Sequence, residues 1–155
     1  MKKLLAALAV TTALLAPSLA MARTVTLSGQ MANYQGQAAY LAIYVTDATG
    51  ALQTTLYVGG TNARYYRDMR AWARGVATLG RLDGITGASV GSGRSFSVSV
   101  EIADALIDAG YQIRVDSAVE HGQVFAATPT IPLVQSSSGQ SFTGTGYVAA
   151  LTVAM

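Results

Sequence analysis

Short segments in which apolar and polar side chains alternate most constrain the fold of this chain. Residues 40–46, Tyr-Leu-Ala-Ile-Tyr-Val-Thr, are rich in β-branched and aromatic side chains and run into the turn Asp47-Ala48-Thr49-Gly50. Residues 52–58 resume the pattern, so the two segments are expected to pair as a hairpin. Alternation with a period of two buries one face of a strand and exposes the other. The chain is therefore predicted to consist mainly of antiparallel strands.

The rest of the chain repeats this pattern in shorter pieces. Gly29 is a possible β-bulge in the first strand, and His121-Gly122 is expected to form a hairpin tip. Further strands are expected near residues 25–31, 96–100, 111–115, 124–125, 131–134 and 147–153, with a short helical turn or loop at 103–110 and a Ser-rich loop at 135–140. Seven or eight short strands predict an all-β fold, an immunoglobulin-like antiparallel β-sandwich with one short helix.

One segment, residues 64–74, has the period of a helix. Asn62 is a plausible cap at its start, and residues 75–80 are expected to form a loop. Trp72 is expected to pack in the core, as aromatic side chains at helical spacing generally do. The apolar face is predicted to carry Tyr65, Met69 and Trp72, and another face Arg67, Arg70 and Arg74.

The N-terminal residues read as a secretory signal peptide. Lys2 and Lys3 supply its charge, residues 4–15 form an apolar run, and Ala20-Met21-Ala22 provides small residues for cleavage. The run is shorter than a membrane-spanning helix, so no direct membrane insertion is expected, and an uncleaved anchor is the alternative. Cleavage near Ala22 would remove residues 1–22 and leave one exported domain, residues 23–155.

Charge and composition exclude several classes of function. Removal of residues 1–22 takes away both lysines, which leaves eight arginines against eight acidic residues. A general nucleic-acid or anionic-membrane binder carries surplus positive charge, so no nucleic-acid partner is expected. The absence of Cys excludes disulfides, iron–sulfur clusters and thiolate zinc sites, and the single histidine cannot form a zinc site alone. No Gly-x-Ser-x-Gly elbow is present, and no catalytic residue or metal site is predicted.

The segment Asp83-Gly84-Ile85-Thr86-Gly87-Ala88-Ser89 is the most informative motif. It fits the pattern Asp-x-x-Ser/Thr-Gly-Ala-Ser/Thr and resembles the site at which bacterial flavin transferases attach FMN to exported proteins. The resemblance implies a phosphodiester between FMN and the hydroxyl of Ser89, made with Mg²⁺ and with FAD as donor. Asp83 and Thr86 would be recognised or would order the loop, and the small Gly87 and Ala88 would keep it accessible. The same residues also form ordinary turn pairs.

Four elements occur in a characteristic order. They are residues 40–46 with their Asp-x-x-Gly turn, residues 66–72 (Tyr-Arg-Asp-Met-Arg-Ala-Trp), the motif at 83–89, and Glu120-His121-Gly122. Together they span about residues 35–132 and resemble a periplasmic bacterial family, domain of unknown function 2271. The resemblance implies a periplasmic electron carrier with covalent FMN, whose partners are a flavin transferase and a membrane ferric-reductase-like protein with PepSY domains. Residues 100–111 depart from that family, which usually has Trp-Asp-Gly and a Pro-Gly turn there, so the geometry of this loop is left open.

Three further residues are candidates for contact with the cofactor. Arg70 or Arg74 could neutralise the flavin phosphodiester, because guanidinium groups match phosphate oxygens. The alternative is a solvated helix face paired with Asp68 and other acids. His121 could donate to a flavin carbonyl or merely form a turn.

The sequence therefore predicts an exported periplasmic flavoprotein that carries FMN on Ser89. It would be a redox carrier and a substrate of flavin transferase, with no turnover of its own, and would pass electrons from a membrane reductase to an acceptor such as ferric iron. The alternative is a cofactor-free immunoglobulin-like binding or structural module, in which the motif is an ordinary loop.

Overall fold

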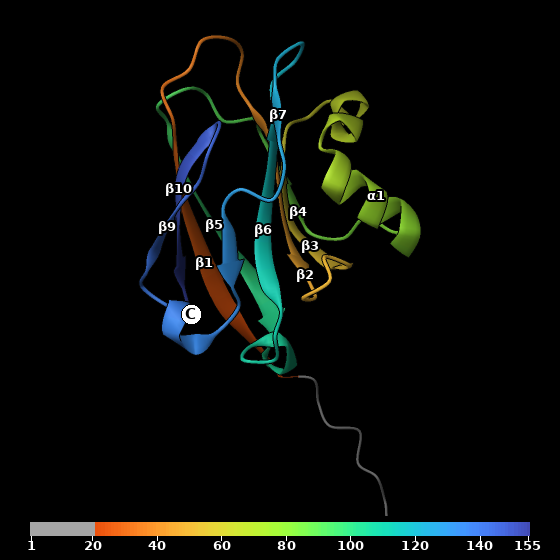
Figure 1. Cartoon of the computed structure of the whole chain (residues 1–155), viewed down its shortest axis with the longest axis vertical. Coiled ribbons are helices and arrows are strands. Elements are labelled where there is room, and N and C mark those ends of the chain that lie inside the picture. Colours follow the sequence, from red (N-terminus) through yellow and green to blue (C-terminus); the bar gives the residue numbers. More distant parts are fainter. Residues whose placement is uncertain (1–20) are drawn as a thin grey trace, which may run out of the picture.

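The structure is a computed structural model that describes residues 21–155. Residues 1–20, which hold most of the predicted signal peptide, lie outside the described residues. Two sheets pack face to face, and one helix covers the outer face of the second sheet (Figure 1). The all-β sandwich with one short helix that the sequence predicts is confirmed.

The first sheet has four strands in the order β5-β1-β10-β9, and the second has six. In the second sheet the order is β4-β3-β2-β6-β7, and β8 pairs with β6 beside β7. The strands are β1 (Ala22–Met31), β2 (Tyr40–Thr46), β3 (Leu52–Gly59), β4 (Ile85–Gly87), β5 (Ser95–Ala103), β6 (Gln112–Ala118), β7 (Val124–Phe125), β8 (Thr130–Pro132), β9 (Ser141–Thr143) and β10 (Val148–Ala154).

The second sheet is buried on both faces, which explains why β2 is buried at every position. Alternate residues of β2 point into two different apolar clusters. Leu41, Ile43 and Val45 belong to the core between the two sheets. Tyr40 and Tyr44 belong to a second cluster beneath the helix, together with Met69 and Trp72 from the segment predicted to be helical. The expected burial of Trp72 is confirmed.

The predicted β2–β3 hairpin is confirmed, whereas the predicted bulge at Gly29 is wrong. Gly29 pairs regularly with Phe96 on β5 and Leu151 on β10, and the register of β1 shifts one step later, between Gln30 and Met31. A side chain at Gly29 would collide with the ring of Phe96. The glycine therefore makes room for an aromatic ring of the neighbouring strand.

The helical segment differs from the prediction at both ends. Residues 64–74 divide into a 3₁₀ helix, η1 (Ala63–Asp68), and an α-helix, α1 (Arg70–Leu79). Asn62 does act as a cap, since its side chain accepts from the N–H of Arg64 and begins η1. Helix α1 continues through Gly75, which was predicted to lie in a loop. A Cβ at this position would lie 2.5 Å from Leu52, so the glycine lets the helix pack closely on β3.

Two 3₁₀ turns, η2 (Asp104–Leu106) and η3 (Gln135–Ser137), complete the fold. The first occupies the segment expected to be a short helical turn or loop. The hairpin tip predicted at His121-Gly122 is confirmed, since it joins β6 to the antiparallel β7. Over residues 21–155 no helix reaches the length and apolarity that crossing a membrane requires.

Candidate functional site

The flavin-attachment motif forms the edge of the six-stranded sheet. Ile85, Thr86 and Gly87 make up β4, which pairs in parallel with Tyr57, Val58 and Gly59 of β3. The backbone continues this pairing, because the N–H of Gly60 donates to the carbonyl of Gly87 at 2.8 Å. Parallel neighbours require a crossover, and α1 provides it between β3 and β4. The middle of the motif is thus a short ordered strand, flanked on both sides by residues without regular secondary structure.

Two glycines of the motif are required by the closeness of β3. Gly84 has φ +105°, and a Cβ there would lie 2.6 Å from the carbonyl oxygen of Thr55. A Cβ at Gly87 would lie 2.5 Å from the hydroxyl oxygen of Tyr57. Real Cβ atoms do not approach other atoms so closely, and left-handed backbone favours glycine. Both positions therefore exclude larger residues for packing reasons alone.

Asp83 anchors the start of the motif to β3. Its carboxylate accepts from the hydroxyl of Thr54 at 3.1 Å and from the N–H of Thr55 at 3.2 Å. Arg81 lies 3.6 Å from the same carboxylate in an ion pair that is open to solvent. Exposed pairs of this kind contribute little, so the two hydrogen bonds to β3 carry the anchoring. Asp83 orders the motif, one of the two roles that the sequence suggested for it.

Ser89 is held from both sides. The carbonyl of Ala88 accepts from the hydroxyl of Tyr57 at 3.3 Å, and Val90 exchanges two backbone hydrogen bonds with Ala39, of 2.8 and 2.9 Å. Burial raises the pKa of Tyr57, which keeps its hydroxyl protonated as a donor. Ser89 itself is half-buried, and within residues 21–155 its hydroxyl makes no hydrogen bond. The candidate acceptor therefore lies on a backbone that its two neighbours hold in place, and its residue is partly accessible.

A groove of about 410 Å³ lies beside the motif. It is lined by Thr86, Gly87 and Ala88 of the motif and by Gly60, Thr61 and Tyr66. The hydroxyl of Tyr66 donates to the carbonyl of Gly60 at 2.8 Å, and its ring meets that of Trp72 edge to face, 5.6 Å between centroids. Fixed aromatic rings and small residues fit a planar ring system. The residues present are compatible with a flavin tethered at the end of β4, although Ser89 does not line the groove.

The other candidates lie away from the motif. Arg70 and Arg74 line a shallow surface with Arg67 along α1, and Arg70 also lines a separate groove with His121. Arg70 therefore lines one surface together with Arg74 and another groove together with His121. The motif residues form a separate group in β4 and beside it, namely Asp83, Thr86, Gly87, Ala88 and Ser89. None of these grooves contains both groups of residues. Tyr66 of η1 is instead the side chain from the helical segment that lines the groove beside the motif.

A buried carboxylate that the sequence did not single out fixes the helix above the sheet. Asp116 of β6 is fully buried and accepts from the hydroxyl of Tyr44 at 2.8 Å and from the N–H groups of Trp72 and Ala127 at 3.0 and 2.9 Å. The indole N–H of Trp72 donates to Thr55 at 2.9 Å. An acid within a run of apolar strand residues was the available signal, since buried acids are rare unless paired.

Comparison with known proteins gives a match to a protein family. Residues 22–150 match the family described as predicted periplasmic protein, DUF2271. No curated protein matches the chain, and no solved structure matches it. Because the family match covers the whole sandwich from β1 into β10, the chain belongs to the DUF2271 family of predicted periplasmic proteins.

Proposed function

We propose that this protein is an exported periplasmic flavoprotein that carries FMN on Ser89 and passes electrons between a membrane reductase and an extracytoplasmic acceptor. The observation that carries the proposal is the geometry of the motif. Ile85, Thr86 and Gly87 form an edge strand, and two residues after it Ser89 carries a hydroxyl that makes no hydrogen bond within residues 21–155. The signal-peptide pattern and the family's description as periplasmic support export, with cleavage near Ala22.

The attachment needs a second protein that can reach the motif. Ile85 and Thr86 are exposed, and β4 pairs with β3 on one side only, so its other edge is open. Leu79, Leu82 and Ile85 are exposed apolar side chains on the segment that leads into β4. An open strand edge flanked by apolar residues suits recognition by a modifying enzyme. A flavin transferase is the partner that the motif's pattern indicates.

In the proposed modification the Ser89 oxygen forms a bond to the phosphorus on the FMN side of FAD. The bond between the two phosphates of FAD breaks, AMP leaves, and the hydroxyl proton passes to solvent or to a base of the transferase. The chain itself contributes the oxygen, its position at the end of β4 and the anchoring by Asp83. When bound, FMN supplies reversible electron transfer, and the protein supplies position and electrostatics.

Tyr66 and the glycines of the groove would lie against the flavin. The ring of Tyr66 is already fixed by its hydrogen bond to Gly60 and by Trp72, so it would meet a planar ligand without reordering. Ferric iron is the proposed acceptor, and a membrane reductase of the PepSY type the proposed donor. The second candidate function is a cofactor-free binding module, favoured by the fact that packing alone accounts for Gly84 and Gly87.

The test is the intact mass of the exported protein after co-expression with a flavin transferase. We expect the wild type to gain the mass of one FMN less one water, and Ser89→Ala to gain nothing. Ser92→Ala is the matched control, since Ser92 is an exposed serine just beyond the motif. Yellow colour that stays with the unfolded chain would show that the link is covalent.

An unmodified wild type, made beside a transferase that modifies a control substrate, would remove the flavin proposal and leave the binding module. Modification that persists in Ser89→Ala would place the link on another residue.

A further inference from the structure

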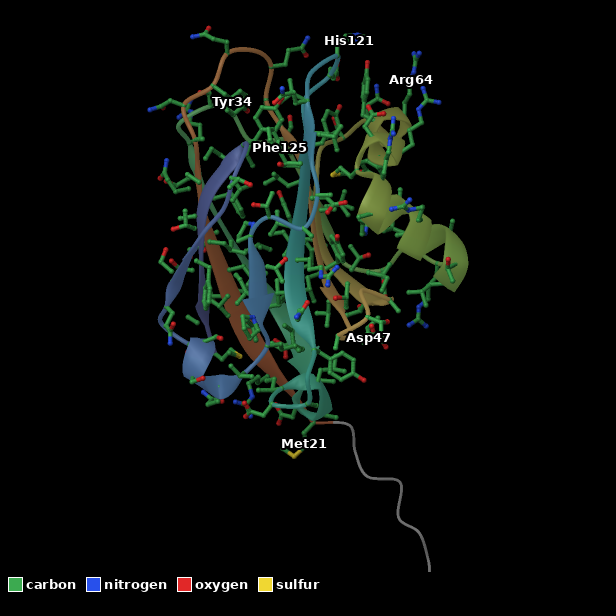
Figure 2. All side chains as sticks on the ribbon, viewed as in Figure 1. Met21, Tyr34, Asp47, Arg64, His121 and Phe125 are labelled. Carbon is green, nitrogen blue, oxygen red and sulfur yellow. The ribbon has the colours of Figure 1, made fainter. Side chains whose placement is uncertain are left out.

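A second groove, away from the motif, lies between η1 and the β6–β7 hairpin. It encloses about 340 Å³, and we call it the arginine groove after Arg64, Arg67 and Arg70. Asp68 and His121 complete its polar lining, with apolar walls from Tyr65, Val119, Gly122 and Val124. Figure 2 shows Arg64 and His121 at the same end of the molecule, opposite Met21 and Asp47. Three arginines and one histidine, all of them exposed, therefore line one concavity.

The arginines of this groove have no acidic partner. The structure holds two ion pairs within residues 21–155, Arg23 with Asp104 and Arg81 with Asp83. Asp68 lines the groove without approaching any arginine to within ion-pair distance, so the expectation that it pairs with the helix face is wrong. Glu120, next to His121, instead accepts from the hydroxyl of Tyr40 at 3.2 Å. The positive charge of the groove is thus left open to solvent.

Local stability does not account for these arginines. Arg70 occupies the first residue of α1, where the helix dipole disfavours positive charge, and the last turn of α1 carries no basic residue. Arg70 and Arg74 are four residues apart on α1, and Arg67 of η1 lines the same shallow surface, so like charges lie close together and repel one another. The mature chain has as many acids as arginines, so the cluster is not a consequence of a generally basic composition. A bound anion would reverse both penalties.

We propose that the arginine groove binds a phosphate-bearing anion. Three arginines and one aspartate give the groove a net charge of plus two, which matches a phosphate dianion. Guanidinium forks bind phosphate oxygens in pairs, and the His121 ring can donate another hydrogen bond. The site is concave and bounded on two sides, which favours a small anionic group over a flat protein surface.

This site does not depend on the proposed flavin attachment. Its lining shares no residue with the motif or with the groove beside β4. Binding is therefore expected in the unmodified protein and in Ser89→Ala, which separates a failure of this inference from a failure of the proposed function.

The experiment is a titration of the ¹⁵N-labelled mature protein with inorganic phosphate at constant ionic strength, followed by amide NMR shifts. We expect saturable shifts at residues 64–70 and 119–124. Arg67→Gln and Arg70→Gln should each weaken binding at least roughly tenfold, because each removes charge-assisted hydrogen bonds. Arg94→Gln, an exposed arginine elsewhere on the surface, is the matched control and should bind as the wild type does.

A second arm uses phosphatidylcholine vesicles with and without phosphatidylglycerol. Phosphate binding without vesicle binding would identify a free phosphorylated ligand, and vesicle binding that requires Arg67 and Arg70 would identify a lipid headgroup as the source. Linear shifts that do not saturate, or equal weakening by Arg94→Gln, would show general charge screening and overturn the proposal. Arg67, Arg70 and Arg94 are all exposed, so the three variants are expected to fold.

Discussion

The carboxylate of Asp116 on β6 accepts a hydrogen bond from the backbone N–H of Trp72, the third residue of α1, at 3.0 Å. Met69 precedes the helix and gives it no side-chain cap. A residue of the sheet therefore does what a neighbouring Ser or Asp usually does for a helix. The same carboxylate holds Tyr44 and Ala127, so helix, sheet and the loop after β7 meet at one buried group.

Asp116→Asn is expected to lower the free energy of unfolding by about 2–4 kcal/mol, because an amide offers one acceptor oxygen to the three donors that the carboxylate now satisfies. Urea denaturation followed by tryptophan fluorescence measures this. Glu101→Gln, at an exposed carboxylate of β5, is the control and should change stability little. Equal stability of the two variants would contradict the role given to Asp116.

Tyr44 gives the fold a dependence on alkaline pH. Burial and the neighbouring Asp116 carboxylate raise the pKa of Tyr44 above its ordinary value of 10.0. A pKa that is raised in the folded state contributes stability below the unfolded value, and this stability is lost as the pH rises above about 10. Stability should therefore fall less steeply above about pH 10 in Tyr44→Phe than in the wild type. Urea denaturation midpoints measured at pH values below and above about 10 test this prediction. Tyr111→Phe is the control, because Tyr111 is only half-buried.

Asp47 in the β2–β3 turn responds to acid. The hydroxyl and N–H of Thr49 donate to its carboxylate at 2.6 and 2.9 Å, and these bonds and that from Ala51 lower the pKa of Asp47 below 3.8. A lowered pKa contributes stability above the unfolded value, which is lost as the pH falls through the folded value. NMR titration of the carboxyl carbon should give a midpoint that rises in Thr49→Ala and is retained in Thr49→Ser. An unchanged midpoint in Thr49→Ala would refute the assignment.

Gly84→Ala is expected to destabilise the attachment of β4 by about 1–3 kcal/mol, because the new Cβ would press on the Thr55 carbonyl in left-handed backbone. Faster hydrogen exchange at residues 85–87 and 57–59 would report the loss. Gly91→Ala is the matched control, since its nearest contact is Arg94 at 3.5 Å and its φ is not left-handed. Comparable exchange in both variants would mean that β4 tolerates the side chain.

Variants of Asp83 and Thr86 distinguish the effect of packing from the effect of recognition by the transferase. Asp83→Asn should reduce both stability and flavin attachment, because its carboxylate anchors β4. Thr86→Val should leave stability within about 0.5 kcal/mol, since Thr86 is exposed, and lower attachment only if the transferase reads its hydroxyl. Intact mass and urea denaturation of both variants give the answer. Full attachment in both would show that the transferase reads neither side chain.

The sandwich could be predicted because its strands carry their own signal. The β-branched and aromatic residues of 40–46 predicted a strand, and the structure makes this segment β2, with Leu41, Ile43 and Val45 in the core between the sheets. Strands β4 and β9 have three residues each, too few for any period to show. The parallel pairing of β4 also depends on a partner that α1 separates from it in the sequence.

The start of the helix and the lining of the arginine groove both involve residues that are far apart in the sequence. Side-chain spacing located the helical segment, but the start of α1 is set by Asp116 and its continuation by the contact of Gly75 with Leu52. His121 reaches the arginines only because the β6–β7 hairpin folds back beside η1. The motif residues, Arg70 and His121 could therefore be named from the sequence, but the grooves that they share with distant residues could not.

The pairing of β1 with β10 has a consequence for how the molecule is made. Thr26 lies opposite Ala154, and Leu27 opposite Val153, so the first strand of the described chain shares a ladder with the last. A chain synthesised from its N-terminus leaves one hydrogen-bonding edge of β1 unpaired long before β10 exists to pair with it. Such distant pairs form slowly, and a partly made sheet offers open edges to other chains. Completion of the sandwich must therefore follow synthesis of Val148–Ala154, and until then this edge of β1 is open to pairing with other chains.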